Sequence, residues 1–72
     1  MQRKLNIAIV GATGAVGQVI LQILAERDFP LENLYLLASA RSVGKRIEFK
    51  AKDYFVEDLA SFDFSQVDIA FF

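Results

Sequence analysis

Apolar positions along the chain form three nearly continuous runs, separated by stretches with a different pattern. Residues 5–10 and 33–38 are rich in Ile, Leu and Val, with few polar interruptions. Such runs are typical of parallel strands that are buried on both faces of a sheet. Residues 67–72 form the third run and predict another buried strand.

Residues 15–27, between the first two predicted strands, have the periodicity of an amphipathic helix. Apolar residues recur at spacings of three and four, with Gln and Glu on the opposite side. Pro30 prevents the helix from continuing, and residues 5–38 therefore predict a β-α-β unit. We expect one apolar stripe of the helix to pack on the sheet, made up of Val16, Val19, Ile20, Ile23 and Leu24.

The segment after the second strand has a shorter period. Residues 46–49 alternate polar and apolar, and with a turn at 51–53 and a second strand at 54–57 they predict a β-hairpin. We expect its charged residues to pair across the strands on a solvated face. Residues 62–66 are compatible with one helical turn. The predicted fold class is α/β: a Rossmann-like, mostly parallel sheet, truncated to a β-α-β unit, a hairpin and the start of a further strand.

The composition excludes several functions. The chain has no cysteine and no histidine, so it lacks thiolate metal ligands, a thiol nucleophile and the commonest general base. A net charge of −1 gives no indication of nucleic acid or an anionic membrane as partner. No apolar run approaches the roughly 20 residues of a membrane span. The basic start does not resemble a signal peptide, so we expect a cytoplasmic protein.

The hydrophobic fraction of 54% is high for 72 residues, and the last apolar run ends at Phe72 without a polar tail. We therefore expect residues 1–72 to be the N-terminal part of a dinucleotide-binding domain. A catalytic and dimerisation domain would then be absent from this chain.

Three glycines at three-residue intervals, Gly11, Gly14 and Gly17, lie between the first strand and the helix. A strand, a glycine turn and a helix together bring backbone N–H groups to a phosphate at the helix N-terminus. We expect Gly11 to permit the turn, Gly14 to let the backbone approach a pyrophosphate, and Gly17 to allow close packing. The Thr13 hydroxyl can add a donor. The spacing differs from G-x-G-x-x-G, and no Gly-Lys-Ser/Thr follows, which argues against a nucleoside triphosphatase.

The end of the second strand indicates which dinucleotide is bound. NAD-binding proteins commonly carry an acid there for the ribose 2′-hydroxyl, and residues 36–42 contain none. Arg41, with Ser39 and Ser42 beside it, forms a cluster of donors that can hold a 2′-phosphate by charge-assisted hydrogen bonds. We therefore predict NADP as the cofactor. The alternative is that Arg41 is an ordinary solvated arginine of a loop.

Residues 11–17, residues 37–42 with Gly44 and Lys45 behind them, and residues 67–72 resemble the start of the aspartate-β-semialdehyde dehydrogenase family. The resemblance implies NADPH-dependent reduction of β-aspartyl phosphate to L-aspartate semialdehyde, with release of phosphate. This reaction feeds the synthesis of lysine through diaminopimelate, and of methionine, threonine and isoleucine. The resemblance also implies a homo-oligomer when full length. By the same likeness the cofactor would contact Thr13, Gly14, Ala15 and Val16 at its pyrophosphate, and Arg41 and Ser42 at its 2′-phosphate.

The family's catalytic cysteine and histidine and its substrate-binding arginines would lie beyond residue 72. We therefore expect the chain alone to be inactive, since no thiol is present to form an acyl-enzyme. Two alternatives remain open. One is N-acetyl-γ-glutamyl-phosphate reductase, which has a similar glycine turn, and the other is a non-catalytic NADP-sensing module on the same fold.

Overall fold

The computed structural model describes residues 4–72 and contains the predicted β-α-β unit. Strand β1 (Leu5–Val10) leads into helix α1 (Ala15–Glu26), and strand β2 (Leu31–Ala38) returns beside β1. The two strands are parallel, with Ile9 opposite Leu36. Strand β2 begins two residues earlier than predicted, because pairing starts where the Leu5 N–H donates to the Pro30 carbonyl at 2.9 Å.

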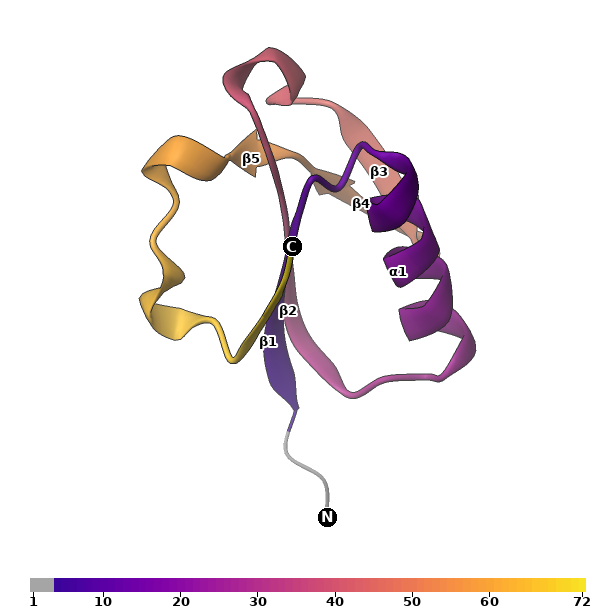
Figure 1. The fold of residues 1–72 in the computed structure, drawn as a ribbon. Coiled ribbons are helices and arrows are strands. Elements are labelled where there is room, and N and C mark those ends of the chain that lie inside the picture. The colour runs from indigo at the N-terminus through magenta and orange to yellow at the C-terminus, as the bar shows by residue number, and fades with distance from the viewer. Residues whose placement is uncertain (1–3) are drawn as a thin grey trace.

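A four-stranded sheet organises the molecule in the order β5-β2-β1-β6 (Figure 1). Strands β5 (Glu57–Asp58) and β6 (Ile69–Phe71) are parallel to their neighbours. Counted along the chain, this is the order 3-2-1-4 of a dinucleotide-binding doubly wound sheet. The α/β fold class predicted from the sequence is therefore confirmed. Among residues 4–72, no helix is long and apolar enough to cross a membrane.

The two faces of the sheet are covered by different segments (Figure 1). Helix α1 and a hairpin of β3 (Arg46–Phe49) and β4 (Lys52–Phe55) lie on one side, and the connection from β5 to β6 lies on the other. That connection contains two short 3₁₀ turns, η2 (Leu59–Ser61) and η3 (Phe64–Gln66). Aromatic rings join it to the sheet, since the Phe62 ring centroid lies 5.1 Å from that of Tyr35.

The main core lies between the sheet and the layer of α1 and the hairpin. Alternate residues of β1 and β2 point into it, as the period of a strand requires. Leu21 and Leu24 fill it from the helix, and Phe49 and Val56 from the segments after β2. The residues that β1 and β2 contribute to this core are Ile7, Ile9, Leu34, Leu36 and Ala38.

The prediction of which α1 residues are buried is wrong for most of the apolar stripe. Val16, Val19 and Ile23 are 67%, 53% and 47% exposed, whereas Gly17, Leu21 and Leu24 form the buried face. The helix is apolar around much of its circumference, so its periodicity alone allowed two orientations. The close approach of Gly17 to the loop before the helix turns the Leu21 side inward.

The hairpin also differs from its predicted bounds. Its turn consists of Lys50 and Ala51, so β4 begins at Lys52, and Glu57 pairs with β2 in the main sheet. Within the hairpin, residues 46–55 of the described chain, cross-strand charge pairing is confirmed for Arg46 and Asp53 alone, at 3.5 Å. Lys50 instead bonds Asp28, outside the hairpin, at 2.8 Å.

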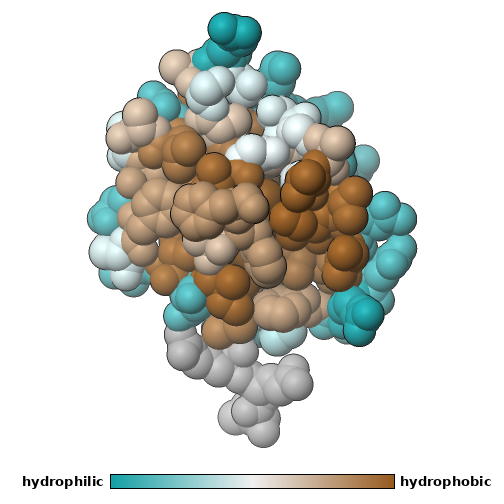
Figure 2. Space-filling view, viewed as in Figure 1, coloured by the Kyte–Doolittle hydropathy of each residue, from teal (hydrophilic) through white to brown (hydrophobic). Residues whose placement is uncertain are grey.

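The last strand is parallel, as predicted, but it is not buried. Within residues 4–72, β1 is the only strand beside β6; Ile69 of β6 is 37% exposed, and Phe72, which follows it, is 84% exposed. Figure 2 shows apolar side chains gathered over the face of the molecule on which β6 ends. The prediction of burial is wrong because β6 is an edge strand in this chain.

Candidate dinucleotide-binding site

The loop after β1 is held tightly against the end of β2. Gly11 has a φ of +78°, a conformation that favours glycine. The N–H groups of Gly11 and Ala12 both donate to the Leu37 carbonyl, at 2.8 and 3.2 Å, and the Gly14 N–H donates to the Gly11 carbonyl at 2.9 Å. The predicted role of Gly11 is therefore confirmed. The loop turns over residues 11–14 and leads into α1.

Helix α1 begins at this loop with N–H donors that have no acceptor within residues 4–72. Gly14 is its N-cap and provides no side-chain cap. The first N–H groups of a helix have no intrahelical acceptor, and here they belong to the exposed residues Ala15 and Val16. These donors, together with the positive end of the helix dipole, favour an anion at this point.

Gly17 provides the close packing expected of it, although against the loop and not the strand. A Cβ atom on Gly17 would lie 2.5 Å from the Gly11 carbonyl oxygen and 2.8 Å from the Ala12 Cα. At Gly14 the nearest atom to an added Cβ would be 3.4 Å away, which is an ordinary contact within the protein. The protein therefore requires glycine at position 17, and its own packing does not require it at position 14.

The segment after β2 forms the short 3₁₀ turn η1 (Ala40–Ser42). The Ser42 N–H donates to the Ser39 carbonyl at 2.9 Å. A second hydrogen bond follows this turn: the N–H of Gly44, which has a φ of +91°, donates to the Val56 carbonyl at 2.9 Å. These bonds hold the backbone that carries Arg41, while its side chain is exposed and forms no ion pair within residues 4–72.

The structure places both segments at one edge of the sheet, at the carboxyl ends of β1 and β2 (Figure 1). Ligands of open α/β sheets bind outside this edge, where the strand order reverses between β1 and β6. All the predicted site residues lie there, and all but the half-buried Ser42 are exposed: Gly11, Thr13, Gly14, Ala15, Val16, Ser39, Arg41 and Ser42. Their contacts with a cofactor remain predictions.

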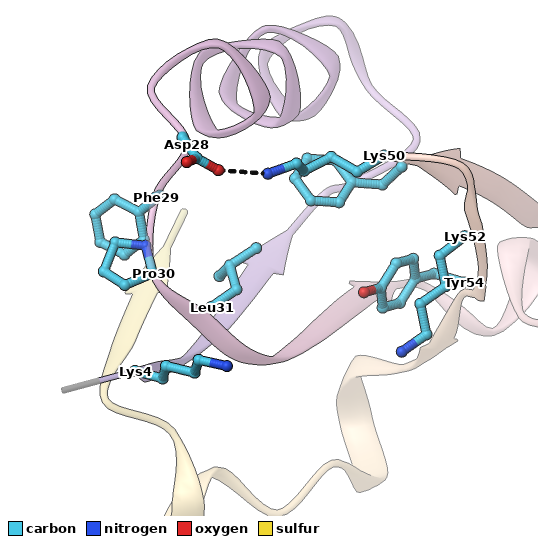
Figure 3. Close-up of a pocket in the computed structure, with 9 residues that line it drawn as sticks. Lys4, Asp28, Phe29, Pro30, Leu31, Lys50, Lys52 and Tyr54 are labelled. Carbon is cyan, nitrogen blue, oxygen red and sulfur yellow. Dashed lines mark hydrogen bonds and ion pairs between the residues drawn. The ribbon is translucent and has the colours of Figure 1, made fainter. Parts of the chain in front are cut away.

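A depression lies at the other edge of the sheet (Figure 3). It has a volume of about 440 Å³ and lies beside Lys4 and Leu31, at the amino ends of β1 and β2. Asp28 and Lys50 bridge its rim, and the hydrogen bond from Lys50 holds the pKa of the Asp28 carboxyl below its usual value. Its position at the amino ends argues against it as the dinucleotide site.

One residue at the glycine loop was missed from the sequence. The side-chain Nε2 of Gln18 donates to the Ala12 carbonyl at 3.2 Å. The sequence assigns Gln18 to the polar side of the helix with Gln22 and Glu26, at the position where a phosphate-binding P-loop has lysine. Its helical position, on the side away from the expected apolar stripe, favoured a solvated side chain.

The chain is similar to known proteins over its whole length. Residues 6–72 match the family model described as semialdehyde dehydrogenase, NAD binding domain. The chain is 60% identical to an aspartate-semialdehyde dehydrogenase of Legionella pneumophila and 54% identical to a USG-1 protein homolog of Pseudomonas aeruginosa. Each alignment covers 100% of this chain and 21% of the relative.

Solved structures agree with this relationship. The crystal structure of aspartate semialdehyde dehydrogenase II from Vibrio cholerae, complexed with ASA, superposes with a TM-score of 0.91 at 51% identity. The match covers 94% of this chain and 22% of that one. The chain thus spans about a fifth of the length of the relatives it matches. With its glycine loop at the helix N-terminus and its 3-2-1-4 sheet, the chain belongs to the semialdehyde dehydrogenase family, in its NAD-binding domain.

Proposed function

We propose that this chain is the amino-terminal, NADP-binding part of an aspartate-semialdehyde dehydrogenase. The observation that carries the proposal is the pairing of two features at one edge of the sheet. The unpaired N–H groups at the start of α1 suit a pyrophosphate, and Arg41 follows the end of β2. The likeness to aspartate-semialdehyde dehydrogenases, at up to 60% identity, supports the reaction class.

In this proposal the chain binds and orients the nicotinamide cofactor, and residues outside it carry the chemistry. The complete enzyme would reduce β-aspartyl phosphate to L-aspartate semialdehyde with release of phosphate, on the route to lysine, methionine, threonine and isoleucine. The 72 residues contain no cysteine and no histidine. The isolated chain should therefore bind cofactor and show no turnover above buffer.

Arg41 supports NADP over NAD within this proposal. No carboxylate lies in residues 36–42 to accept hydrogen bonds from a ribose 2′-hydroxyl. The backbone hydrogen bonds around η1 hold the backbone of Arg41 just beyond the end of β2, the end at which this proposal expects that ribose. Ser39 and Ser42 add hydroxyl donors next to the guanidinium.

Titration of NADP and NAD against the complete enzyme and its Arg41→Ala variant tests the assignment. A charge-assisted hydrogen bond contributes about 1.5–3 kcal/mol, so NADP should bind roughly 10- to 150-fold more weakly. NAD should change by less than about threefold, because its ribose carries no phosphate. Arg41→Lys should recover part of the loss, since an ammonium lacks the planar fork. Equal losses for both cofactors would contradict the NADP assignment.

A non-catalytic dinucleotide-binding protein is the second candidate. It is kept because the relatives of this chain are not all named as dehydrogenases: one, at 54% identity, is a USG-1 protein homolog. Assay of the complete protein for phosphate-dependent oxidation of L-aspartate semialdehyde separates the two. Turnover would establish the dehydrogenase. NADP binding without turnover would favour the non-catalytic protein and leave the cofactor site intact.

A further inference from the structure

We propose that Gln18 is a positioning residue of the cofactor site, which orients the Thr13 N–H toward the pyrophosphate by holding the peptide unit between Ala12 and Thr13. The inference rests on the proposed dinucleotide-binding function. It assigns a task to a side chain that lies outside the glycine pattern itself.

Hydrogen bonds hold Ala12 at both its N–H and its carbonyl. Its N–H donates to the Leu37 carbonyl at 3.2 Å, and its carbonyl accepts from the Gln18 Nε2 at 3.2 Å. Ala12 is fully buried, whereas the next residue, Thr13, is exposed. The peptide unit that joins them therefore lies at the boundary between the core and the surface of the site.

Because the peptide bond is trans, a hydrogen bond that fixes the Ala12 carbonyl also fixes the direction of the Thr13 N–H. The carbonyl of one residue and the N–H of the next lie in one plane and point in opposite directions. Because Gln18 draws the Ala12 carbonyl toward α1, the Thr13 N–H must point away from the Gln18 side chain. Within residues 4–72 this N–H donates to no backbone or side-chain acceptor, so it is left available to a ligand.

The packing around Gly17 allows Gln18 to do this. The backbone of Gly17 lies directly against Gly11 and Ala12, close enough to exclude any side chain. This contact brings the first turn of α1 within reach of the loop carbonyl. The side-chain amide of Gln18 then donates a hydrogen bond to the Ala12 carbonyl of the loop.

The Gln18→Met variant of the complete enzyme tests the proposal. Methionine has a similar length and helix propensity but no N–H donor. The matched control is Gln22→Met, one turn later on α1, where the glutamine donates to Glu26 at the surface and not to the glycine loop. Direct fluorescence titration with NADPH and NADH gives the affinities, and steady-state kinetics with the semialdehyde gives kcat.

We expect Gln18→Met to weaken NADPH and NADH by the same factor, about tenfold, because both carry the pyrophosphate that the Thr13 N–H would contact. The value of kcat at saturating cofactor should stay within twofold. Gln22→Met should leave both affinities unchanged. Unchanged affinities in Gln18→Met, or an equal loss in Gln22→Met, would overturn the proposal.

Two further measurements separate this proposal from the function on which it rests. Adenosine 2′-monophosphate lacks the pyrophosphate, so its own dissociation constant, obtained by competition with the NADPH affinity of each variant taken into account, should be unchanged in Gln18→Met and raised in Arg41→Ala. Loss of its binding in Gln18→Met would indicate general damage to the site and overturn the positioning role. If the unmodified enzyme bound neither dinucleotide, the proposed function itself would fail. Thermal melts and circular dichroism establish that Gln18→Met is folded, and Gln18→Lys, which keeps a donor, should retain NADPH affinity.

Discussion

Gly17 lies so close to Gly11 that a Cβ atom on residue 17 would come within 2.5 Å of the Gly11 carbonyl oxygen. This contact joins the start of α1 to the loop after β1 without an intervening side chain. The spacing of the loop donors that face the candidate site therefore depends on the absence of a single methyl group.

Gly17→Ala should destabilise the chain. Alanine favours the helix by about 1 kcal/mol, but its Cβ would overlap backbone atoms that no rotamer change can move. Overpacking of this kind costs about 1–3 kcal/mol or more, so we expect a net loss. Urea unfolding followed by circular dichroism measures it, and a variant of unchanged or higher stability would contradict the packing role.

Gly14→Ala should behave in the opposite way. Position 14 has a φ of −85°, which any residue adopts, and an added Cβ would meet only an ordinary contact at 3.4 Å. Stability should therefore change by less than about 0.5 kcal/mol. NADP affinity should fall, because the methyl group would occupy space that we assign to the pyrophosphate. Equal affinity in the variant and the original would show that the phosphate does not approach this atom.

Ala51→Gly should stabilise the hairpin. Lys50 and Ala51 form its two-residue turn with φ values of +52° and +65°, a conformation that hairpin turns usually give to Asn and Gly. Relief of the left-handed strain, about 1–2 kcal/mol, should exceed the entropic cost of glycine, about 0.5–1 kcal/mol. Ala60→Gly, in an exposed turn without positive φ, is the control and should not stabilise. Comparison of the two urea midpoints checks the prediction.

The ion pair of Asp28 and Lys50 should make stability depend on acid pH. The hydrogen bond and the charge of Lys50 lower the pKa of Asp28 from its ordinary 3.8, so the folded chain binds this proton less readily than the unfolded chain. The contribution is therefore present above pH 3.8 and is lost as the pH falls through the lower, folded value. We expect the original chain to lose more stability between pH 6 and pH 3 than Lys50→Met does.

Asp28→Asn provides the control for this comparison, because asparagine also tolerates the φ of +49° at position 28. Asp63, whose pKa is lowered by the hydrogen bond from Ser65, is present in every variant and cancels in the differences. Parallel pH profiles of Lys50→Met and the original chain would exclude a stabilising pair. High salt should reduce the difference, since both groups lie at the surface.

The isolated chain should be marginally stable and should associate. A unit of this size buries only about 60% of its unfolded surface, and β6 is an edge strand that carries exposed Ile69. The apolar face in Figure 2 lies over this strand. Ile69→Lys should reduce association, because a charge on an edge strand opposes pairing. Val43→Lys removes another exposed apolar residue, which follows η1 and lies outside β6, and should not reduce association. Sedimentation velocity over a range of concentrations distinguishes these outcomes.

The strand, the glycine turn and the helix at residues 5–26 were determined by the sequence itself, because each depends on local chemistry. Branched and apolar residues specify β1, the positive φ at Gly11 requires glycine, and the periodicity behind it specifies a helix. The same holds for the place of Arg41 after β2, since a parallel β-α-β unit brings the carboxyl ends of its strands to one edge.

The tertiary structure decided which of two apolar sides of α1 is buried. Both Val19 and Leu21 are apolar, and the periodicity cannot rank them. The contact of Gly17 with the loop rotates the Leu21 side inward and leaves Val19 half-exposed. The tertiary structure also decided that Glu57 pairs with β2 in the main sheet and that the Gln18 side chain donates to the Ala12 carbonyl. These relationships join residues through space, and the packing that selects them does not exist until the sheet and helix have come together.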